Sequence, residues 1–282
     1  MNKQNKYAVL SLSGGLDSST LLLNLLNTDH EVICLSYSYG QKHSVELERA
    51  QSLIKYLQDK GYNLKHQIIT LDGLSNLLVS GLIDNDSMEM EKGHYAHKNA
   101  LTTVVPNRNA IFAAITYAVA LSVVKRTGEP CKIALGTHMG DFNNKEQTGI
   151  YPDCSEEFRI ALEHAFKIGN WDSDKVDYYA PYNITDKTGV LEDGIIKCKS
   201  MGLDYKEIYS RTNTSYNPIQ LSNGEWVSDY KSGSSIERIE SFIKLGLEDP
   251  SQYADDDGTL VSWDFVKEYV IKICEEFELS RG

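Results

Sequence analysis

A short segment rich in glycine and serine is the part of the sequence best suited to chemistry. Residues 12–19 read L-S-G-G-L-D-S-S and lie between an apolar stretch and a helix-like stretch. Gly14 and Gly15 let the backbone turn sharply and approach a ligand without Cβ clashes. The free N–H groups and positive dipole end of the following helix would face this loop. Serine hydroxyls complete a cradle suited to phosphate or pyrophosphate: Ser13, Ser18 and Ser19.

This segment is neither a Walker A loop nor a dinucleotide fingerprint, because the G-x-x-x-x-G-K-[ST] lysine and the G-x-G-x-x-G spacing are both absent. It resembles the S-G-G-x-D-S signature of the PP-loop ATP pyrophosphatases, which implies ATP and Mg²⁺ as cofactors and transfer of AMP. A polar turn with Asp17 as a helix N-cap is the alternative, but it does not explain the whole string. The residues expected to bind the nucleotide are Leu12, Ser13, Gly14, Gly15, Leu16, Asp17, Ser18, Ser19 and Gly136.

Three further motifs follow in series. Residues 39–43 read Y-G-Q-K-H, residues 105–109 read V-P-N-R-N, and residues 151–154 read Y-P-D-C. From about Tyr7 to Tyr253 the chain resembles the QueC family, the 7-cyano-7-deazaguanine synthases of the queuosine pathway. That resemblance implies conversion of 7-carboxy-7-deazaguanine and ammonia to a nitrile, through an adenylated carboxylate and an amide. It also implies a homodimer.

Candidate catalytic residues combine the loop with two cations. Asp17 and Ser18 are expected at the phosphates, with Asp17 near Mg²⁺, and Arg108 and Lys187 are expected to contact anionic oxygens. The alternatives are a surface ion pair for Arg108 and a solvated helix-end charge for Lys187.

Candidate substrate residues surround the same predicted edge of the sheet. Asp141 and Asp153 could accept two parallel N–H bonds from a guanine-like base, or could instead cap helices. Tyr39 and Gln41 would line the pocket, or would cap a strand and its turn. The full set of substrate-binding candidates is Tyr39, Gln41, Arg108, Asn109, Asp141 and Asp153.

The chain departs from the resembled family at its zinc site. The four positions where that family carries zinc-binding cysteines are Ser215, Asp229, Ser232 and Ser235 here. A neutral serine hydroxyl is a poor Zn²⁺ ligand beside a thiolate, so we predict no metal at these positions and expect serine hydrogen bonds to hold the loop.

Two more departures leave the product open. The link before Y-P-D-C is lengthened by residues 142–150, and Ser155 stands where arginine is usual. Three functions remain: nitrile synthesis, transfer of the activated deazaguanine to another amine such as a protein in phage defence or nucleic-acid modification, and a non-catalytic nucleotide-binding partner module.

Composition restricts the partners. The formal net charge of −12 disfavours direct nucleic-acid binding, because such a surface repels phosphate backbones. Five scattered cysteines indicate reduced thiols rather than a disulfide scaffold. With no run of 18 apolar residues and no signal-like N-terminus, a cytoplasmic protein without a membrane partner is expected.

The surrounding elements predict how these residues are positioned. Four apolar strands (residues 7–12, 32–37, 66–71 and 132–135) alternate with five helices (residues 18–26, 44–57, 110–124, 156–166 and 187–199). This alternation predicts an α/β domain over residues 1–202, with a doubly wound parallel sheet that binds ligands at the carboxyl ends of its strands. Residues 203–282 are predicted to form a small C-terminal extension with helices over 235–245 and 260–277.

Overall fold

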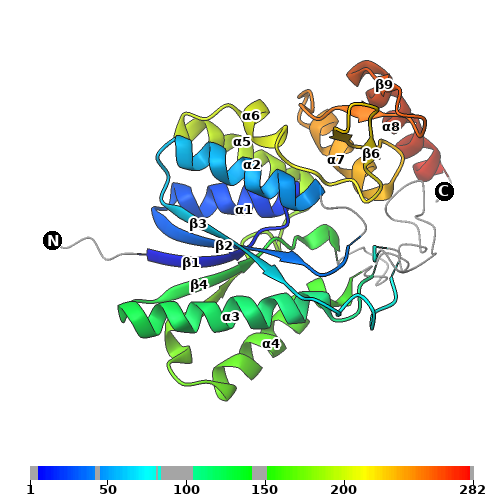
Figure 1. Cartoon of the computed structure of the whole chain (residues 1–282). Helices are drawn as coiled ribbons and strands as arrows, with labels where there is room; N and C mark the ends of the chain where they lie inside the picture. Colours follow the sequence, from blue (N-terminus) through cyan, green and yellow to red (C-terminus); the bar gives the residue numbers. More distant parts are fainter. Residues whose placement is uncertain (1–5, 42–44, 81, 84–103, 142–150, 280–282) are drawn as a thin grey trace.

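The central feature of the computed structural model is a five-stranded sheet in which every pair of neighbours is parallel. The structure describes residues 6–41, 45–80, 82–83, 104–141 and 151–279. The strand order is β3-β2-β1-β4-β5 (Figure 1). The strands are β1 (Lys6–Ser11), β2 (His30–Ser38), β3 (Leu64–Thr70), β4 (Cys131–Leu135) and β5 (Val176–Tyr179).

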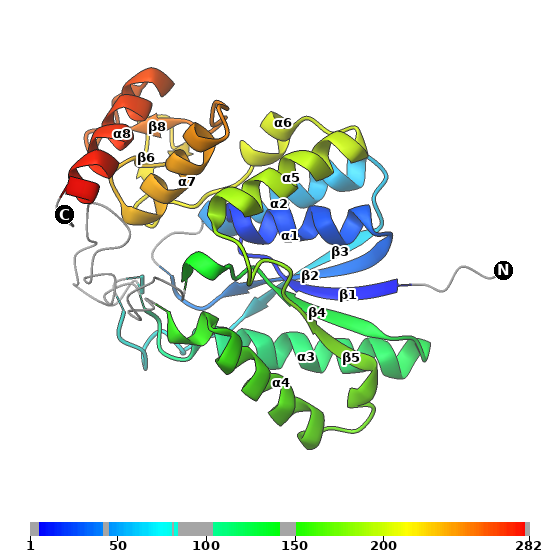
Figure 2. The ribbon, with the colours of Figure 1, turned by 180° about the vertical axis from the view of Figure 1, so that it is seen from behind.

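Helices cover both faces of the sheet, as Figures 1 and 2 show from opposite sides. Ala8 and Leu10 of β1 pack in the core beneath α1, α2 and α5, whereas Val9 packs in the core beneath α3. This alternation follows from the two-residue period of a strand, and it makes β1 apolar on both faces. The helices are α1 (Leu16–Asn27), α2 (Val45–Asp59), α3 (Arg108–Thr127), α4 (Glu156–Gly169), α5 (Lys187–Met201) and α6 (Tyr205–Tyr209).

The doubly wound parallel sheet predicted from the sequence is confirmed, and all four predicted strands and five predicted helices are present. The short strand β5 was missed because its sequence V-D-Y-Y carries only one fully buried residue. The domain boundary at residue 202 stays a prediction.

Helix α3 is the one described helix long and apolar enough to cross a membrane, judged by length and composition. It lies along the sheet against β1 and β4, and its buried side chains join the core there: Ala113, Thr116, Tyr117, Ala120, Val123 and Val124. Its apolar character is thus explained by packing on the sheet.

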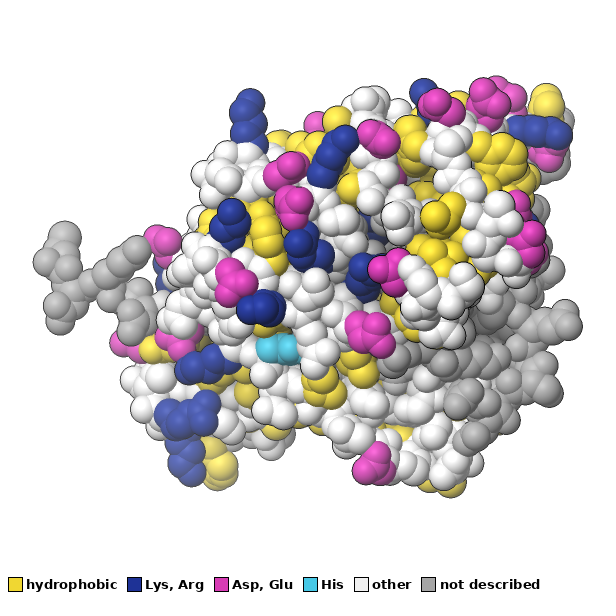
Figure 3. Space-filling view, turned by 45° about the horizontal axis from the view of Figure 1, so that its top comes forward, with side chains coloured by type: hydrophobic (Ala, Val, Ile, Leu, Met, Phe, Trp, Pro, Cys, Tyr) yellow, Lys and Arg dark blue, Asp and Glu magenta, His cyan; other side chains and the backbone are white. Residues whose placement is uncertain are grey.

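The C-terminal extension has a core of its own, in which Ile236, Ile239, Val266 and Val270 are buried. It lies beside the carboxyl-end edge of the sheet (Figure 1), and apolar side chains gather over this part in the space-filling view (Figure 3). Its elements are β6 (Ile219–Gln220), β7 (Trp226–Val227), α7 (Gly233–Lys244), β8 (Tyr253–Ala254), β9 (Leu260–Val261) and α8 (Trp263–Leu279).

The helix predicted over residues 260–277 begins too early. Leu260 and Val261 pair with β8 as a short antiparallel strand, and the helix starts at Trp263. The apolar period alone could not separate these two residues from the helix that follows them.

Candidate functional site

Two loops meet at the point where the strand order reverses. The chain passes from β1 outward to β2 and β3, then returns to place β4 on the other side of β1. In open α/β sheets, ligands bind in the crevice at this switch point. Here Gly136, just after β4, comes so close to α1 that an added Cβ would lie 2.8 Å from the backbone N of Ser18. Gly136 therefore allows the close approach of the second loop to the first.

The glycine-serine loop after β1 is held by its own side chains. The hydroxyl of Ser18 accepts from the N–H of Ser13 at 3.2 Å and lies 3.0 Å from the hydroxyl of Ser13. The N–H of Gly15 donates to the Ser13 hydroxyl at 3.2 Å. Gly15 is the N-cap of α1, so the free N–H groups of the first helical turn face this loop, as an anion cradle requires.

Within this loop, backbone and side chains have different roles. Leu12 and Leu16 are fully buried in the core, so only their backbone groups can face a nucleotide. Gly14 has φ +84°, and an added Cβ would collide with the carbonyl oxygen of Glu46 in α2. The hydroxyl of Ser19 is buried and has no hydrogen-bond partner among the described residues.

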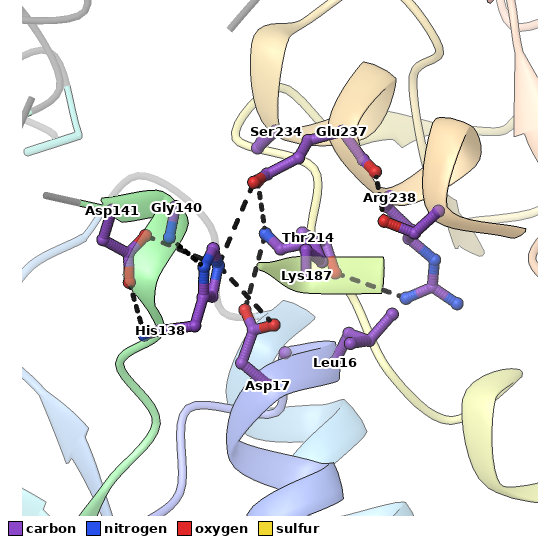
Figure 4. A network of polar contacts seen from close by, with 12 residues as sticks. Leu16, Asp17, His138, Gly140, Asp141, Lys187, Thr214, Ser234, Glu237 and Arg238 are labelled. Atoms are coloured by element: carbon purple, nitrogen blue, oxygen red, sulfur yellow. Dashed lines mark hydrogen bonds and ion pairs between the residues drawn. The ribbon is translucent and has the colours of Figure 1, made fainter. Parts of the chain in front are cut away.

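Five ionisable side chains converge beside this loop (Figure 4). The Lys187 ammonium lies 2.7 Å from Oε2 of Glu237 and 3.5 Å from Oδ2 of Asp17. His138 Nε2 lies 3.9 Å from Oδ1 of Asp17, 3.6 Å from Oδ1 of Asp141 and 4.0 Å from Oε1 of Glu237. Three carboxylates therefore surround one lysine and one histidine.

For the catalytic candidate Lys187, the alternative is a solvated charge at a helix end, and the structure rejects it. Lys187 is 5 % exposed, so it is not a solvated helix-end charge. It begins α5, where the positive end of the helix dipole disfavours a cation. Burial lowers the pKa of Lys187, but Asp17, Glu237 and Asp141 raise it more, and the net shift is upward. The ammonium is therefore held charged, ready to face an anionic ligand.

His138 was missed in the sequence, although it lies between the two candidates Gly136 and Asp141. Its Nδ1 accepts from the N–H of Gly140 at 3.1 Å, so a neutral ring carries its proton on Nε2. Nε2 is buried and, like Oδ1 of Asp17, has no hydrogen-bond partner in the described part of the chain. Buried polar atoms without hydrogen bonds are rare, so these two are candidates for contact with a polar ligand.

The pKa values of His138 and Asp141 are coupled. Burial lowers the pKa of His138, but the carboxylates of Asp141, Asp17 and Glu237 outweigh burial and leave it above its ordinary value. For Asp141, burial raises the pKa and the charges of His138 and Lys187 lower it, and the net shift is upward. Oδ2 of Asp141 also accepts from the N–H of His138 at 3.0 Å. Asp141 thus stabilises the loop after β4, and only part of its carboxylate is left to accept hydrogen bonds from a guanine-like base.

Arg108 begins α3, the helix that packs on the sheet face opposite to α1. It donates a hydrogen bond to the hydroxyl of Tyr39, and the charge of Glu46 acts on it as well. In the C-terminal extension, Tyr151 and burial raise the pKa of Tyr216, whereas the charge of Arg108 lowers it, and the net shift is upward. A half-buried guanidinium among tyrosines can stack on and pair with a planar acid, as a substrate site for such an acid would require.

Of the three other substrate candidates, Gln41 and Asn109 have local hydrogen-bond partners. Gln41 accepts from the N–H of Tyr39 at 2.9 Å and donates to the carbonyl of Tyr37 at 3.0 Å, so it caps the end of β2. Asn109 donates to Sγ of Cys154 at 3.4 Å. Asp153 lies half-buried in the 3-10 turn η3 (Pro152–Cys154). The lengthened segment 142–150 lies outside the described residues.

Glu46 gives the site a measurable pH dependence. Burial raises the pKa of Glu46 from 4.5 to about 7, with Arg108 opposing the shift. A carboxyl group whose pKa is higher in the folded state stabilises the fold below its unfolded pKa and loses that contribution as pH rises through about 7. As the pH rises from ~4.5 to ~8, the unfolding free energy of Glu46→Gln is therefore expected to increase by roughly 2–3 kcal/mol relative to that of the unsubstituted chain. Urea unfolding of both proteins at the two pH values checks this, and parallel pH profiles would contradict it.

The four side chains at the resembled family's zinc positions do come together. One oxygen of Asp229 accepts from the hydroxyls of Ser215, Ser232 and Ser235 at 2.5, 2.7 and 2.8 Å. Its other oxygen accepts from the N–H groups of Lys231 and Ser232 at 2.8 and 2.5 Å. All four side chains are 3 % exposed or less. We call Ser215, Asp229, Ser232 and Ser235 the serine–aspartate cluster.

Removal of the central carboxylate should destabilise the extension. Asp229→Ala leaves buried hydroxyls and N–H groups without an acceptor, so a loss of at least ~3 kcal/mol of unfolding free energy is expected. Asp204→Ala is the matched control, because it removes an exposed N-cap carboxylate and should cost about 1 kcal/mol. Urea unfolding measures both variants. Equal losses, or a melting temperature of the unsubstituted chain that EDTA lowers, would contradict the role given to this cluster.

Fold and site together define a doubly wound α/β protein of the PP-loop class, with its glycine-serine loop at the switch point of a parallel sheet. The family model described as "Queuosine biosynthesis protein QueC" matches residues 7–225. The "7-cyano-7-deazaguanine synthase 2" of Colwellia psychrerythraea is 36% identical over 249 residues, which cover 88% of this chain and 99% of that protein. The "7-cyano-7-deazaguanine synthase" of Psychromonas ingrahamii is 33% identical, with coverage of 89% and 99%. The chain belongs to the QueC family.

Solved structures give weaker likenesses. A 4-thiouridine synthetase in complex with RNA and ATP aligns over 95% of this chain and 53% of its own, at 14% identity and a TM-score of 0.43. The NMN synthetase of Francisella tularensis aligns over 96% of this chain and 87% of its own, at 12% identity and a TM-score of 0.38.

Proposed function

We propose that this chain adenylates the carboxylate of a 7-carboxy-7-deazaguanine-type substrate with ATP and then forms the amide or nitrile. The observation that carries the proposal is the set of groups around the loop after β1. A preformed cradle, the buried ammonium of Lys187 and two buried atoms that make no hydrogen bond to the described residues, Asp17 Oδ1 and His138 Nε2, meet at the switch point. The 33–36% identical relatives are named for the product 7-cyano-7-deazaguanine, which supports a deazaguanine as the substrate class.

The chemistry requires this distribution of charge. A carboxylate is a poor electrophile, and acyl adenylation gives it AMP as a good leaving group. The cradle and Lys187 would hold the departing pyrophosphate, so that catalysis rests on positioning and electrostatics. On the other side of the crevice, Arg108 and Tyr39 would orient the acid.

Magnesium fits this site only together with the nucleotide. Among the described residues, no three His, Cys, Asp or Glu side chains could hold a metal on their own. Mg²⁺ commonly keeps its waters and binds through one or two carboxylates plus substrate phosphates. Asp17, whose buried Oδ1 accepts no hydrogen bond from the described residues, would serve as such a carboxylate. When bound, Mg²⁺ would neutralise triphosphate charge in a site that already contains three carboxylates.

The test is incubation of the protein with ATP, Mg²⁺ and 7-carboxy-7-deazaguanine, with and without ammonia. Release of AMP and pyrophosphate that depends on the deazaguanine acid is the expected result. Mass spectrometry of the product then separates the nitrile from the amide and from an adduct on a protein amine. ATP that binds but is not cleaved with any acceptor would instead support a non-catalytic nucleotide-binding module.

A further inference from the structure

Glu237 reaches the nucleotide site from the C-terminal extension. It belongs to α7, and its carboxylate makes the shortest contact in the network of Figure 4, the 2.7 Å contact with the ammonium of Lys187. Asp17 lies farther from that ammonium, at 3.5 Å. The extension thus supplies the closest anionic partner of a lysine that belongs to the sheet domain.

The helix that carries Glu237 is anchored on both sides of this residue. Two residues earlier, Ser235 belongs to the serine–aspartate cluster, and its hydroxyl donates to Asp229 at 2.8 Å. One residue later, Arg238 forms a two-pronged pair with Asp249, through contacts of 2.6 and 2.9 Å.

Arg238 also ties this helix to the segment that reaches the loop after β1. It donates to the hydroxyl of Thr212 at 2.7 Å and to the carbonyl of Tyr209 at 3.0 Å. Asn213, the residue after Thr212, donates its N–H to the carbonyl of Gly14 at 2.9 Å. The position of Glu237 is therefore fixed relative to the glycine-serine loop, although the two are far apart in the sequence.

Lys187 needs such a partner more than most lysines do. It is buried, and it occupies the first residue of a helix, where both desolvation and the dipole disfavour its charge. We propose that Glu237 is a positioning residue, which holds the ammonium of Lys187 beside Asp17 in the direction of the nucleotide phosphates. The C-terminal extension is then a part of the ATP site. This inference rests on the proposed function for its ATP site and its catalytic readout, whereas the contact between Glu237 and Lys187 does not depend on that function.

The test compares Glu237→Gln with Glu240→Gln. The first substitution keeps the size of the side chain but removes its charge. Glu240 lies one turn farther along the same helix, and its partner Lys244 is about half exposed, with an Nζ to Oε1 distance of 2.8 Å. The two substitutions therefore remove the same charge from the same helix, one inside the site and one outside it.

Lysine ammonium groups held in buried ion pairs give observable ¹H–¹⁵N NMR correlations, and Lys187→Met identifies the signal of Lys187. In Glu237→Gln that signal should shift or disappear, and the dissociation constant for Mg²⁺·ATP should rise about 10-fold. The kcat/KM for pyrophosphate release should fall about 10²-fold, as expected when a catalytic group is misplaced by about 1 Å. Glu240→Gln should leave the Lys187 signal unchanged, and both the dissociation constant and kcat/KM within about twofold.

An unchanged Lys187 signal together with unchanged ATP affinity in Glu237→Gln would overturn the inference. If Glu237→Gln changes the signal and weakens ATP binding, but even the unsubstituted protein releases no pyrophosphate, the role of Glu237 is supported and the proposed function is refuted instead. Equal effects of both substitutions would show a general effect of the charge of α7, and would also overturn the inference.

Discussion

Asp17→Ala is expected to lower the rate of pyrophosphate release by ~10³-fold or more, because it removes the carboxylate proposed to hold Mg²⁺ at the reacting phosphates. In the structure this carboxylate lies 3.5 Å from the ammonium of Lys187 and 3.9 Å from Nε2 of His138. Its Oδ1 is buried and accepts no hydrogen bond from the described residues, so no hydrogen bond of the fold depends on that atom. Loss of the carboxylate should therefore impair chemistry far more than stability.

Single-turnover kinetics with the deazaguanine acid measures this effect, and thermal unfolding measures the stability of the same variant. The control is Asp59→Ala, whose carboxylate is exposed and pairs with Lys55 at 3.4 Å. The control should react at the rate of the unsubstituted protein. A turnover rate in Asp17→Ala within about tenfold of that rate would remove Asp17 from the catalytic machinery.

Gly14→Ala is expected to abolish measurable ATP binding. A side chain at this position meets two obstacles, because φ is +84° and the new Cβ would collide with the carbonyl oxygen of Glu46. The positive φ alone costs roughly 1–2 kcal/mol for an L-residue. The collision involves backbone, so it can be relieved only if α2 and the loop move apart. That movement would distort the cradle in which the phosphates are expected to bind.

Gly61→Ala separates these two causes. Gly61 has φ +89°, nearly the same as Gly14, but nothing lies within 4 Å of an added Cβ. It should lose a comparable ~1–2 kcal/mol of stability and keep its full ATP affinity. Isothermal titration with Mg²⁺·ATP checks both variants. Equal ATP affinity in the two variants would mean that the contact between Gly14 and α2 does not shape the site.

The sheet and its loop could be predicted from the sequence because both depend on local patterns. An apolar strand, a glycine-serine turn and a helix within residues 7–26 suffice to define the cradle and its direction. Gly136 could be placed at the same edge, since it follows a strand. The reason for its glycine is visible only in three dimensions, where Ser18 lies 2.8 Å from an added Cβ.

The acidic partners of Lys187 show where sequence reasoning stops. Local patterns place Lys187 at a helix start, where an exposed charge is common, and only the fold reveals that it is buried against Glu237. Glu237 lies on an amphipathic helix among other charged residues, and nothing in its spacing distinguishes it from Glu240. Its role arises from the docking of the extension on the sheet domain. His138 could have been recognised, since it follows the same strand end as Gly136.

The most direct test of the central claim is isotope transfer. The account predicts that 7-carboxy-7-deazaguanine labelled with ¹⁸O in its carboxylate, turned over with ATP, Mg²⁺ and ammonia, gives AMP that contains ¹⁸O, because the attacking carboxylate oxygen leaves with the adenylyl phosphate. Formation of ADP and phosphate, or of AMP without the label, would contradict adenylation of this carboxylate.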